Sequence, residues 1–240
     1  MQRRRRMRIN KYLADAGICS RRKADDLIAN GNVSVNGVTL TKPGYDVQEG
    51  DDVRVSGRPV KAGGQKVYYL LNKPIGCVTS VSDDVGRLTV IDLFDDTDAR
   101  LFPVGRLDYN TSGVLLVTND GDFAYHLTHP KHNIDKLYRV RIAGQISKED
   151  ISKLRHGVDI GGFTTSRARV DLVSWTNHST LLDVTIHEGK NRQVRRMFEA
   201  VGKHVEELTR LEFAGLGLGH LKPGQYRKLN PNEVSRLMNL

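Results

Sequence analysis

The order of apolar and polar residues near the start of the chain predicts two short helices. Residues 8–16 repeat an apolar side chain every three to four positions, which predicts a helix that ends at Gly17. Ser20 is a residue type that caps helix N-termini, so a second helix is expected over residues 21–29, with Gly31 just beyond its end. These helices begin a small first domain.

A β-hairpin is predicted next. Residues 33–40 alternate apolar and polar side chains around Asn36-Gly37, a pair that readily adopts the positive φ angles of a tight hairpin turn. A further strand is expected over residues 53–55, and the glycines near residue 63 have the composition of a linker. We therefore divide the chain into a first domain, a linker and a second domain, which span residues 1–62, 63–66 and 67–240.

The second domain is predicted to be rich in strands. Short apolar runs predict strands at residues 67–71, 114–118, 138–142, 168–173 and 181–186. Helices are expected over residues 147–157 and 190–201, and after Asn230, which precedes the proline and glutamate of a capped helix start. Because several strands follow one another without a helix between them, we predict an α+β fold whose sheet is mixed and largely antiparallel.

Length and composition indicate a cytoplasmic protein with a buried core. The chain has 240 residues, of which 38% are hydrophobic. Its longest apolar run, residues 67–71, is far shorter than the roughly 20 residues of a membrane-spanning helix. Residues 1–6 contain four arginines, but no apolar stretch follows them as a secretion signal requires. Cys19 and Cys77 are not paired as in a disulfide framework or a thiolate zinc site.

Positive charge is concentrated in the first domain. It holds 13 Lys and Arg against 7 Asp and Glu, and therefore carries +6 of the net charge of +9. This excess indicates a polyanionic partner, either nucleic acid or an acidic membrane surface, although a solvated basic face is the plainer alternative. Arg21, Arg22 and Lys23 are crowded at the predicted start of a helix, where the helix dipole disfavours cations. Phosphate binding would account for that arrangement.

Two segments of the second domain concentrate reactive side chains. Residues 105–113 place Asp108 in a turn before an apolar strand, a common setting for catalytic groups, although turn aspartates more often bond their own backbone. Residues 188–197 place four cations around the start of a helix. The alternative is a solvated face, but the apolar residues of this helix indicate that it is docked. One arginine could then lie half-buried and pair with a carboxylate.

Two further motifs resemble a cofactor-binding loop and a metal site, but their sequence context argues against both functions. Residues 215–219 alternate glycine as a dinucleotide-binding loop does, but a proline and a glycine follow where the helix should begin. His126, His129 and His132 are three residues apart, but Pro130 interrupts any helix that would align them, and no acidic pair completes a metal site. We therefore predict that the chain uses neither a cofactor nor a metal.

Five segments along the chain resemble motifs of one family of bacterial ribosomal pseudouridine synthases, which includes the small-subunit enzymes and the B-type enzymes of the large subunit. The first resembles the alpha-L RNA-binding domain that many of these enzymes carry. The others resemble the opening, catalytic, tyrosine and basic-helix motifs of their catalytic domain. The segments are residues 8–22, 71–76, 105–113, 136–140 and 188–197. Each motif alone is weak, but their order is specific. The arginines before Met7 depart from the family's usual start and are consistent with an extension of the start site.

The resemblance implies roles for individual residues. Asp108 would be the catalytic carboxylate, Tyr138 would stack on the target uracil, and Arg195 would hold Asp108 in an ion pair. Arg106 would fill the space that the uridine leaves when it is flipped out of the RNA stack. The remaining RNA-contacting residues would be Arg8, Lys11, Ser20, Arg21, Arg22, Lys23, Lys73, Lys190 and Arg192.

The resemblance also implies the reaction, which is the isomerisation of a uridine of ribosomal RNA to pseudouridine. The base is detached from the sugar through nitrogen and rejoined through carbon with no net redox change, so no cofactor is needed. The carboxylate would either attack the sugar or assist formation of an unsaturated sugar, and the sequence leaves both open. Residues 193–197 and the tail over residues 211–240 favour the branch that acts on the large subunit. The expected partner is therefore 23S rRNA, bound by a monomer.

Three alternatives remain. The branch that acts on the small subunit shares the core motifs, so 16S rRNA is the nearest alternative substrate. A non-catalytic RNA-binding factor in ribosome assembly would use the same basic domain, but it would not need Asp108, Tyr138 and Arg195 together. A glycosidase acting on free nucleosides would not need a basic domain, and it would require a second catalytic carboxylate that is not evident in the sequence.

Overall fold

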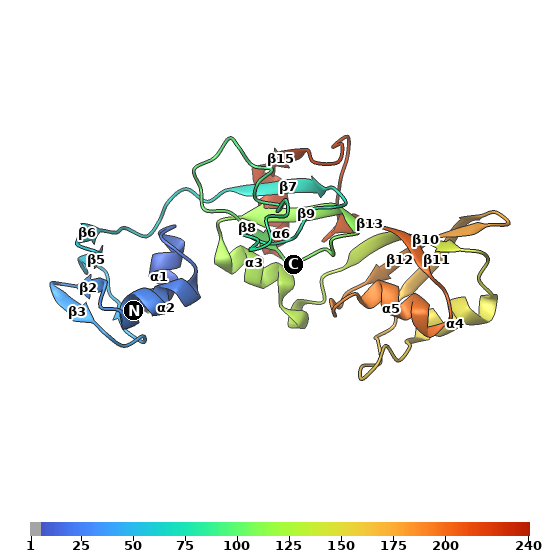
Figure 1. Ribbon diagram of the computed structural model, residues 1–240, viewed down its shortest axis with the longest axis horizontal. Helices are drawn as coiled ribbons and strands as arrows, with labels where there is room; N and C mark the ends of the chain where they lie inside the picture. Colours follow the sequence, from blue (N-terminus) through green and yellow to red (C-terminus); the bar gives the residue numbers. More distant parts are fainter. Residues whose placement is uncertain (1–5) are drawn as a thin grey trace. The chain divides into compact units, whose positions relative to one another are not determined.

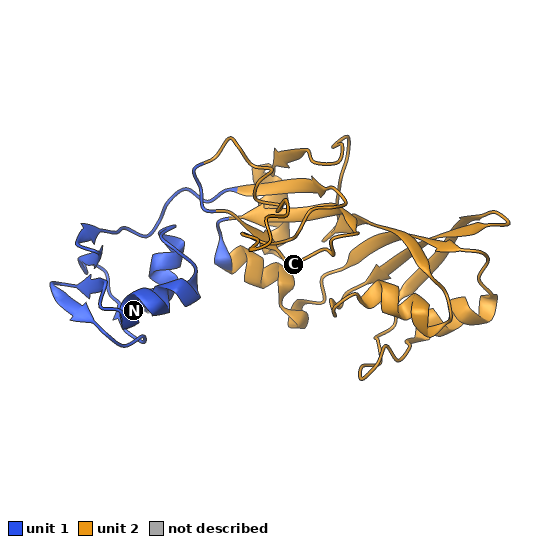
Figure 2. Cartoon of the chain, in the orientation of Figure 1, with its two compact units in different colours: residues 1–67, 98–100, 119–121 blue, residues 68–97, 101–118, 122–240 orange. Residues whose placement is uncertain are grey.

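The computed structural model (Figure 1) describes residues 6–240. The suggested extension of the start site concerns residues 1–6, of which residues 1–5 lie outside the described part. Contacts within the chain define two compact units, which Figure 2 shows in different colours. Unit 1 contains the residues up to 67 together with residues 98–100 and 119–121, whereas unit 2 contains residues 68–97, 101–118 and 122–240.

Unit 1 contains both helices that the sequence predicts. They are α1 (Ile9–Asp15) and α2 (Arg21–Ala29). The hydroxyl of Ser20 accepts a hydrogen bond from the backbone N–H of Lys23 at 3.2 Å, which confirms Ser20 as the N-cap of α2. Ile9 and Leu13 on α1 and Ala24 and Ile28 on α2 are buried in the core of the unit.

The strands of unit 1 form two small sheets. At the predicted hairpin turn, Asn36 and Gly37 have φ angles of 51° and 80°, both positive, which confirms the hairpin. The four-stranded sheet has the order β3-β2-β5-β6, where the strands are β2 (Val33–Val35), β3 (Val38–Leu40), β5 (Val53–Val55) and β6 (Arg58–Pro59). The two-stranded sheet pairs β1 (Met7–Arg8) with β4 (Asp46–Val47).

Unit 2 is built on a nine-stranded sheet with the order β11-β12-β10-β13-β9-β7-β15, to which β14 and β8 add at β13 and β9. All five predicted strands are present, as β7 (Tyr68–Lys73), β9 (Ser112–Thr118), β10 (Lys136–Ala143), β11 (Arg169–Trp175) and β12 (Ser179–Ile186). Four more were not predicted, namely β8 (Phe102–Val104), β13 (Val205–Phe213), β14 (Leu216–Gly217) and β15 (Tyr226–Lys228). Within this sheet only β13 and β9 pair in parallel among the described residues, so the predicted mixed, largely antiparallel α+β fold is confirmed.

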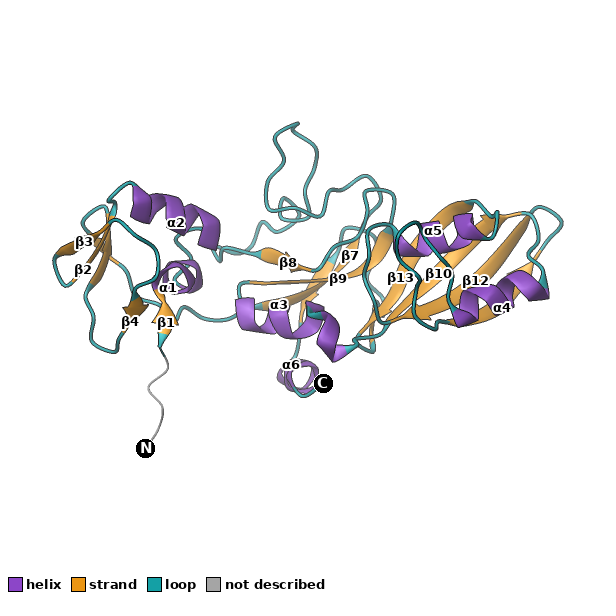
Figure 3. Ribbon diagram, turned by 90° about the horizontal axis from the view of Figure 1, so that it is seen from below, coloured by secondary structure: helices purple, strands orange, loops and turns teal. Residues whose placement is uncertain are grey.

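Three helices lie along the same side of this sheet in Figures 1 and 3, namely α3 (Gly121–Thr128), α4 (Lys148–His156) and α5 (Gln193–Ala200). A 3₁₀ turn (Pro130–His132) follows α3, and α6 (Pro231–Met238) starts with the predicted capping box at Asn230. α5 starts three residues later than predicted, because Arg192 adopts a left-handed backbone with φ 49°. No helix of residues 6–240 is long and apolar enough to cross a membrane.

The unpredicted strand β13 joins the two halves of the sheet. Buried and exposed side chains do not alternate regularly along β13, and its pairing with β10 shifts register twice. The sequence therefore lacks the two-residue repeat by which a strand is predicted. In the observed register Arg210 lies opposite Tyr138 of β10 and opposite Gly113 of β9. A Cβ atom on Gly113 would lie 2.1 Å from the carbonyl oxygen of Arg210, so only glycine allows this close approach.

Candidate active site

Unit 2 contains a cavity of about 710 Å³. Its wall includes five residues that the sequence analysis selected, namely Arg106, Asp108, Tyr138, Lys190 and Arg192. These residues come from the turn before β9, from β10 and from the turn before α5, so the fold gathers segments that are far apart in the sequence. Two further predicted residues, Lys73 and Arg195, do not line the cavity and lie behind its wall.

The predicted contact between Lys73 and RNA is wrong for this structure. Lys73 on β7 is 0% exposed, and its ammonium group donates to the carbonyl oxygens of Pro74 (3.0 Å), Asp108 (3.2 Å) and Thr111 (3.0 Å). Burial lowers the pKa of Lys73 to about 8, although the nearby Cys77 and Asp108 act in the opposite direction. Lys73 therefore holds the backbone of the turn that carries Asp108. The sequence could not show this, because two of the three carbonyls, those of Asp108 and Thr111, come from the folded turn.

The expected ion pair between Arg195 and Asp108 is not formed among the described residues. Arg195 on α5 donates from Nη2 to the carbonyl oxygen of Asn110 at 2.8 Å and from Nη1 to that of Val205 at 3.0 Å. Its guanidinium donates to backbone groups, and its Nε is buried without a hydrogen-bond partner among residues 6–240. Burial lowers the pKa of Arg195, while Asp108 raises it through their charge attraction. Arg195 thus holds the backbone of the same turn as Lys73. It interacts with the carboxylate of Asp108 through charge attraction at longer range.

Tyr138 lies in the cavity wall beside two cations that the sequence analysis did not select. The first is Arg210 on β13, which lies opposite Tyr138 and is 2% exposed. Its Nε donates a hydrogen bond to the carbonyl oxygen of Val114 at 2.7 Å, and its guanidinium lies 5.0 Å from the ring centroid of Phe213. Lys136 donates to two backbone carbonyls, and burial together with Arg210 lowers its pKa to about 8. Both cations line the cavity. Lys136 opens the tyrosine motif and could have been selected, whereas Arg210 lies on the unpredicted strand.

The turn before α5 is braced by a network of polar contacts. Glu188 accepts hydrogen bonds from Ser166 N at 2.6 Å and from Gln193 Nε2 at 3.0 Å, and Gln193 Oε1 accepts one from Lys190 N at 2.9 Å. The ammonium group of Lys190 lies 4.3 Å from the ring centroid of Phe163. Glu188 is therefore a second carboxylate in the cavity wall, which the sequence analysis did not single out. Its contacts explain it as a brace for the cavity wall.

The exposed part of the cavity wall is rich in positive charge. Arg106 and Arg192 are exposed and line the cavity together with Lys190. Arg106 belongs to the same turn as Asp108, whereas Lys190 and Arg192 come from the turn before α5. Cations that surround a half-buried carboxylate suit a substrate with phosphates on either side of its reacting sugar.

The candidate RNA-contacting residues of unit 1 differ in their surroundings. Arg21, Arg22 and Lys23 are exposed at the start of α2, as predicted. Arg8 forms an ion pair with Asp46 at 3.3 Å and donates to a backbone carbonyl. Ser20 serves as the cap of α2, and Lys11 is half-buried on α1. Arg8 is exposed as well but is paired with Asp46, so the basic start of α2 is the exposed cluster of cations in this set.

The structure shows where the three histidines and the glycine-rich segment 215–219 lie. The rings of His126 and His132 lie 4.5 Å apart at the junction of α3 and the 3₁₀ turn. Across residues 6–240, no group of three or more His, Cys, Asp or Glu residues could hold a metal ion. Gly215 and Gly219 flank β14, and both have positive φ, so this segment bends back on β13 instead of opening a helix.

Two protein families match this chain. Residues 67–200 match the family described as RNA pseudouridylate synthase, and residues 7–53 match the S4 domain. The first match covers the cavity segments that contain Asp108, Tyr138 and Arg195, and the second covers α1, α2 and the hairpin of unit 1.

Individual proteins are similar over nearly their whole length. Ribosomal large subunit pseudouridine synthase B of Bacillus subtilis (strain 168) is 46% identical over 235 residues, which are 97% of this chain and 96% of that protein. An uncharacterized RNA pseudouridine synthase of Aquifex aeolicus (strain VF5) is 39% identical over 96% of this chain and 93% of its own. A crystal structure of a pseudouridylate synthase superposes with a TM-score of 0.69 at 29% identity and covers 96% of this chain and 99% of that one.

Proposed function

Because the chain belongs to the RNA pseudouridylate synthase family, we propose that it converts one uridine of large-subunit ribosomal RNA to pseudouridine. The similarity to the large-subunit enzyme of Bacillus subtilis, which extends over nearly both chains, is the observation that carries this proposal. The cavity supports it, because it brings a half-buried carboxylate and an aromatic ring together among cations. The proposed substrate implies that the protein acts in the cytoplasm, and we expect it to act as a monomer.

The reaction exchanges one bond between base and sugar for another. The bond from N1 of the uracil to C1′ of the ribose breaks, the base turns, and a bond from C5 to C1′ forms. The proton on C5 leaves and N1 gains one, so atoms and electrons balance without an oxidant or reductant. Asp108 would act at the sugar, either as a nucleophile or by assisting formation of an unsaturated intermediate. Both routes require its ionised form.

The remaining residues would position the RNA around that reaction. Tyr138 would stack on the flipped uracil, and Arg106 would occupy the space that the base leaves. Lys190 and Arg192, which line the cavity, would contact phosphates of the RNA. In this proposal residues 67–240 choose and isomerise the uridine, whereas residues 1–62 add affinity through phosphate contacts.

Replacing Tyr138 with phenylalanine should separate base stacking from proton transfer. The ring remains, so the Kd for RNA should stay within about twofold of the wild type. We expect single-turnover isomerisation to slow by about 10²-fold, because the Tyr138 hydroxyl would also take part in removing the C5 proton, and groups that transfer protons contribute rate factors of this order. Turnover close to that of the wild type would restrict Tyr138 to stacking.

Replacing Arg21 and Arg22 together with alanine should weaken RNA binding without changing the uridine that reacts. Phosphate contacts release counterions, so the loss of two contacts should flatten the slope of log affinity against log salt by about 1.4 to 1.8. The matched control is Lys42→Ala with Arg58→Ala, which removes two exposed cations elsewhere in unit 1. An unchanged slope in the Arg21/Arg22 variant would show that these arginines form only a solvated face.

The choice of substrate can be tested with purified protein and transcripts of both ribosomal RNAs. We expect pseudouridine at one position of the 23S transcript and none in the 16S transcript. Modification of the 16S transcript alone would favour the alternative that the protein acts on the small subunit. Tight binding to ribosomal RNA without any pseudouridine would favour the non-catalytic assembly factor.

A further inference from the structure

A buried threonine contacts the turn that carries Asp108. Thr79, in the segment between β7 and β8, is 6% exposed. Its hydroxyl oxygen donates to the carbonyl oxygen of Leu107 at 2.7 Å and accepts from the backbone N–H of Leu107 at 3.3 Å. One side chain thus satisfies both backbone polar groups of the residue directly before Asp108.

This contact completes a set of donors around the turn. Lys73 donates to the carbonyls of Asp108 and Thr111, the backbone N–H of Gly76 donates to that of Tyr109, and Arg195 donates to that of Asn110. With Thr79 on Leu107, every carbonyl from residue 107 to residue 111 accepts a hydrogen bond. Thr79 is the donor at the start of the turn. Leu107 is itself only 6% exposed, so water cannot readily replace the hydroxyl.

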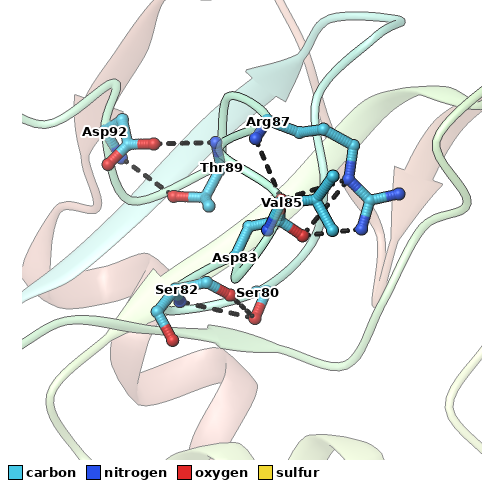
Figure 4. Close-up of polar contacts among 7 residues, drawn as sticks. All are labelled: Ser80, Ser82, Asp83, Val85, Arg87, Thr89 and Asp92. Atoms are coloured by element: carbon cyan, nitrogen blue, oxygen red, sulfur yellow. Dashed lines mark hydrogen bonds and ion pairs between the residues drawn. The ribbon is translucent and has the colours of Figure 1, made fainter.

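The backbone directly before Thr79 is held without help from its side chain. Val78 forms a parallel bridge with Thr89, through the bonds from Val78 N to Leu88 O (2.8 Å) and from Val90 N to Val78 O (2.9 Å). Figure 4 shows further contacts within this loop, between Asp83 and Arg87 and between Thr89 and Asp92. The hydroxyl therefore extends from a braced segment to the catalytic turn.

We propose that Thr79 is a positioning residue for Asp108, which its hydroxyl places through the backbone of Leu107. The proposal rests on the proposed function, since it assigns Thr79 to the reaction of Asp108. Thr79 lies outside the cavity wall and therefore acts through the turn and not on the RNA. Small displacements of a reacting group have large effects on rate, and the effect should fall on turnover rather than on affinity.

Three variants test this proposal. Thr79→Val keeps the shape of the side chain and loses both hydrogen bonds, whereas Thr79→Ser keeps the hydroxyl. Thr89→Val is the matched control, because Thr89 is also buried in this loop but bonds Asp92 instead of the turn. We expect Thr79→Val to slow single-turnover isomerisation by about 10- to 100-fold, with the Kd for RNA within about twofold. Thr79→Ser should restore most of the rate, and Thr89→Val should keep it.

Hydrogen exchange provides a readout that does not depend on activity. The amides of residues 105–111 should exchange faster in Thr79→Val than in the wild type, Thr79→Ser or Thr89→Val. Unchanged exchange in Thr79→Val, or wild-type turnover with faster exchange, would overturn the proposal. If Thr79→Val does not fold, Thr79→Ala serves in its place, because it leaves space instead of adding an apolar methyl group. A wild-type protein that modifies no ribosomal RNA would refute the proposed function, and the exchange data would still decide whether Thr79 holds the turn.

Discussion

Replacing Asp108 with asparagine should reduce pseudouridine formation by at least about 10³-fold, the scale of effect seen when a reacting side chain is removed from an enzyme. The amide has nearly the same shape as the carboxylate, but it carries no charge and cannot attack the sugar. The turn should keep its place, because Lys73 contacts the backbone carbonyl of Asp108 and not its side chain. We therefore expect unchanged thermal unfolding and an RNA Kd within about threefold of the wild type.

The control for this variant is another exchange of carboxylate for amide. Asp171→Asn on the exposed edge strand β11 removes an acidic group that pairs with Arg169 and lies outside the cavity. It should leave the rate of isomerisation unchanged, because surface ion pairs contribute little. Activity near the wild-type level in Asp108→Asn would refute the assignment of Asp108 as the reacting group.

Replacing Arg195 with alanine should slow isomerisation by about 10²- to 10³-fold and have a smaller effect on RNA affinity. The substitution removes the donors to Asn110 O and Val205 O and the positive charge near Asp108. Stability should also fall, since a buried carbonyl left without a donor costs about 1–3 kcal/mol. Thermal unfolding should therefore be measured beside single-turnover rates and Kd values.

Two further variants separate geometry from charge at this position. Arg195→Lys keeps the charge but has one nitrogen where Arg195 uses two, so we expect it to remain at least about tenfold slower than the wild type. Arg196→Ala is the control on the same helix, because Arg196 donates to the carbonyls of Ile160 and Gly161 instead of the catalytic turn. Full activity in Arg195→Lys would show that charge alone is sufficient. A defect confined to RNA binding in Arg195→Ala would contradict the positioning role.

Local patterns predicted most of the elements that carry the candidate site. The turn around Asp108 and the strand that contains Tyr138 were expected from composition and alternation. The docked basic helix was expected as well, although its first residues form a turn instead. Such features depend on neighbouring residues in the chain, which is why the sequence reveals them. The same holds for the caps at Ser20 and Asn230.

Features that depend on distant segments could not be predicted. The register shifts of β13 mask its pattern, so Arg210 was missed as a neighbour of Tyr138. A lysine that follows an apolar strand resembles a surface residue, and only the folded turn supplies two of the three carbonyls to which the buried Lys73 donates. Sequence spacing does not encode whether Arg195 contacts the carboxylate of Asp108 or the carbonyl of Asn110, because both belong to the same turn.

The most direct test of the account is pseudouridine mapping on ribosomal RNA from cells that lack this protein. The cells are complemented with either the wild type or Asp108→Asn, expressed at equal levels. We predict that one uridine of 23S rRNA stays unmodified in the deletion strain and in the Asp108→Asn strain, and that the wild type restores pseudouridine there. An unchanged pseudouridine map in the deletion strain, or restoration by Asp108→Asn, would contradict the account.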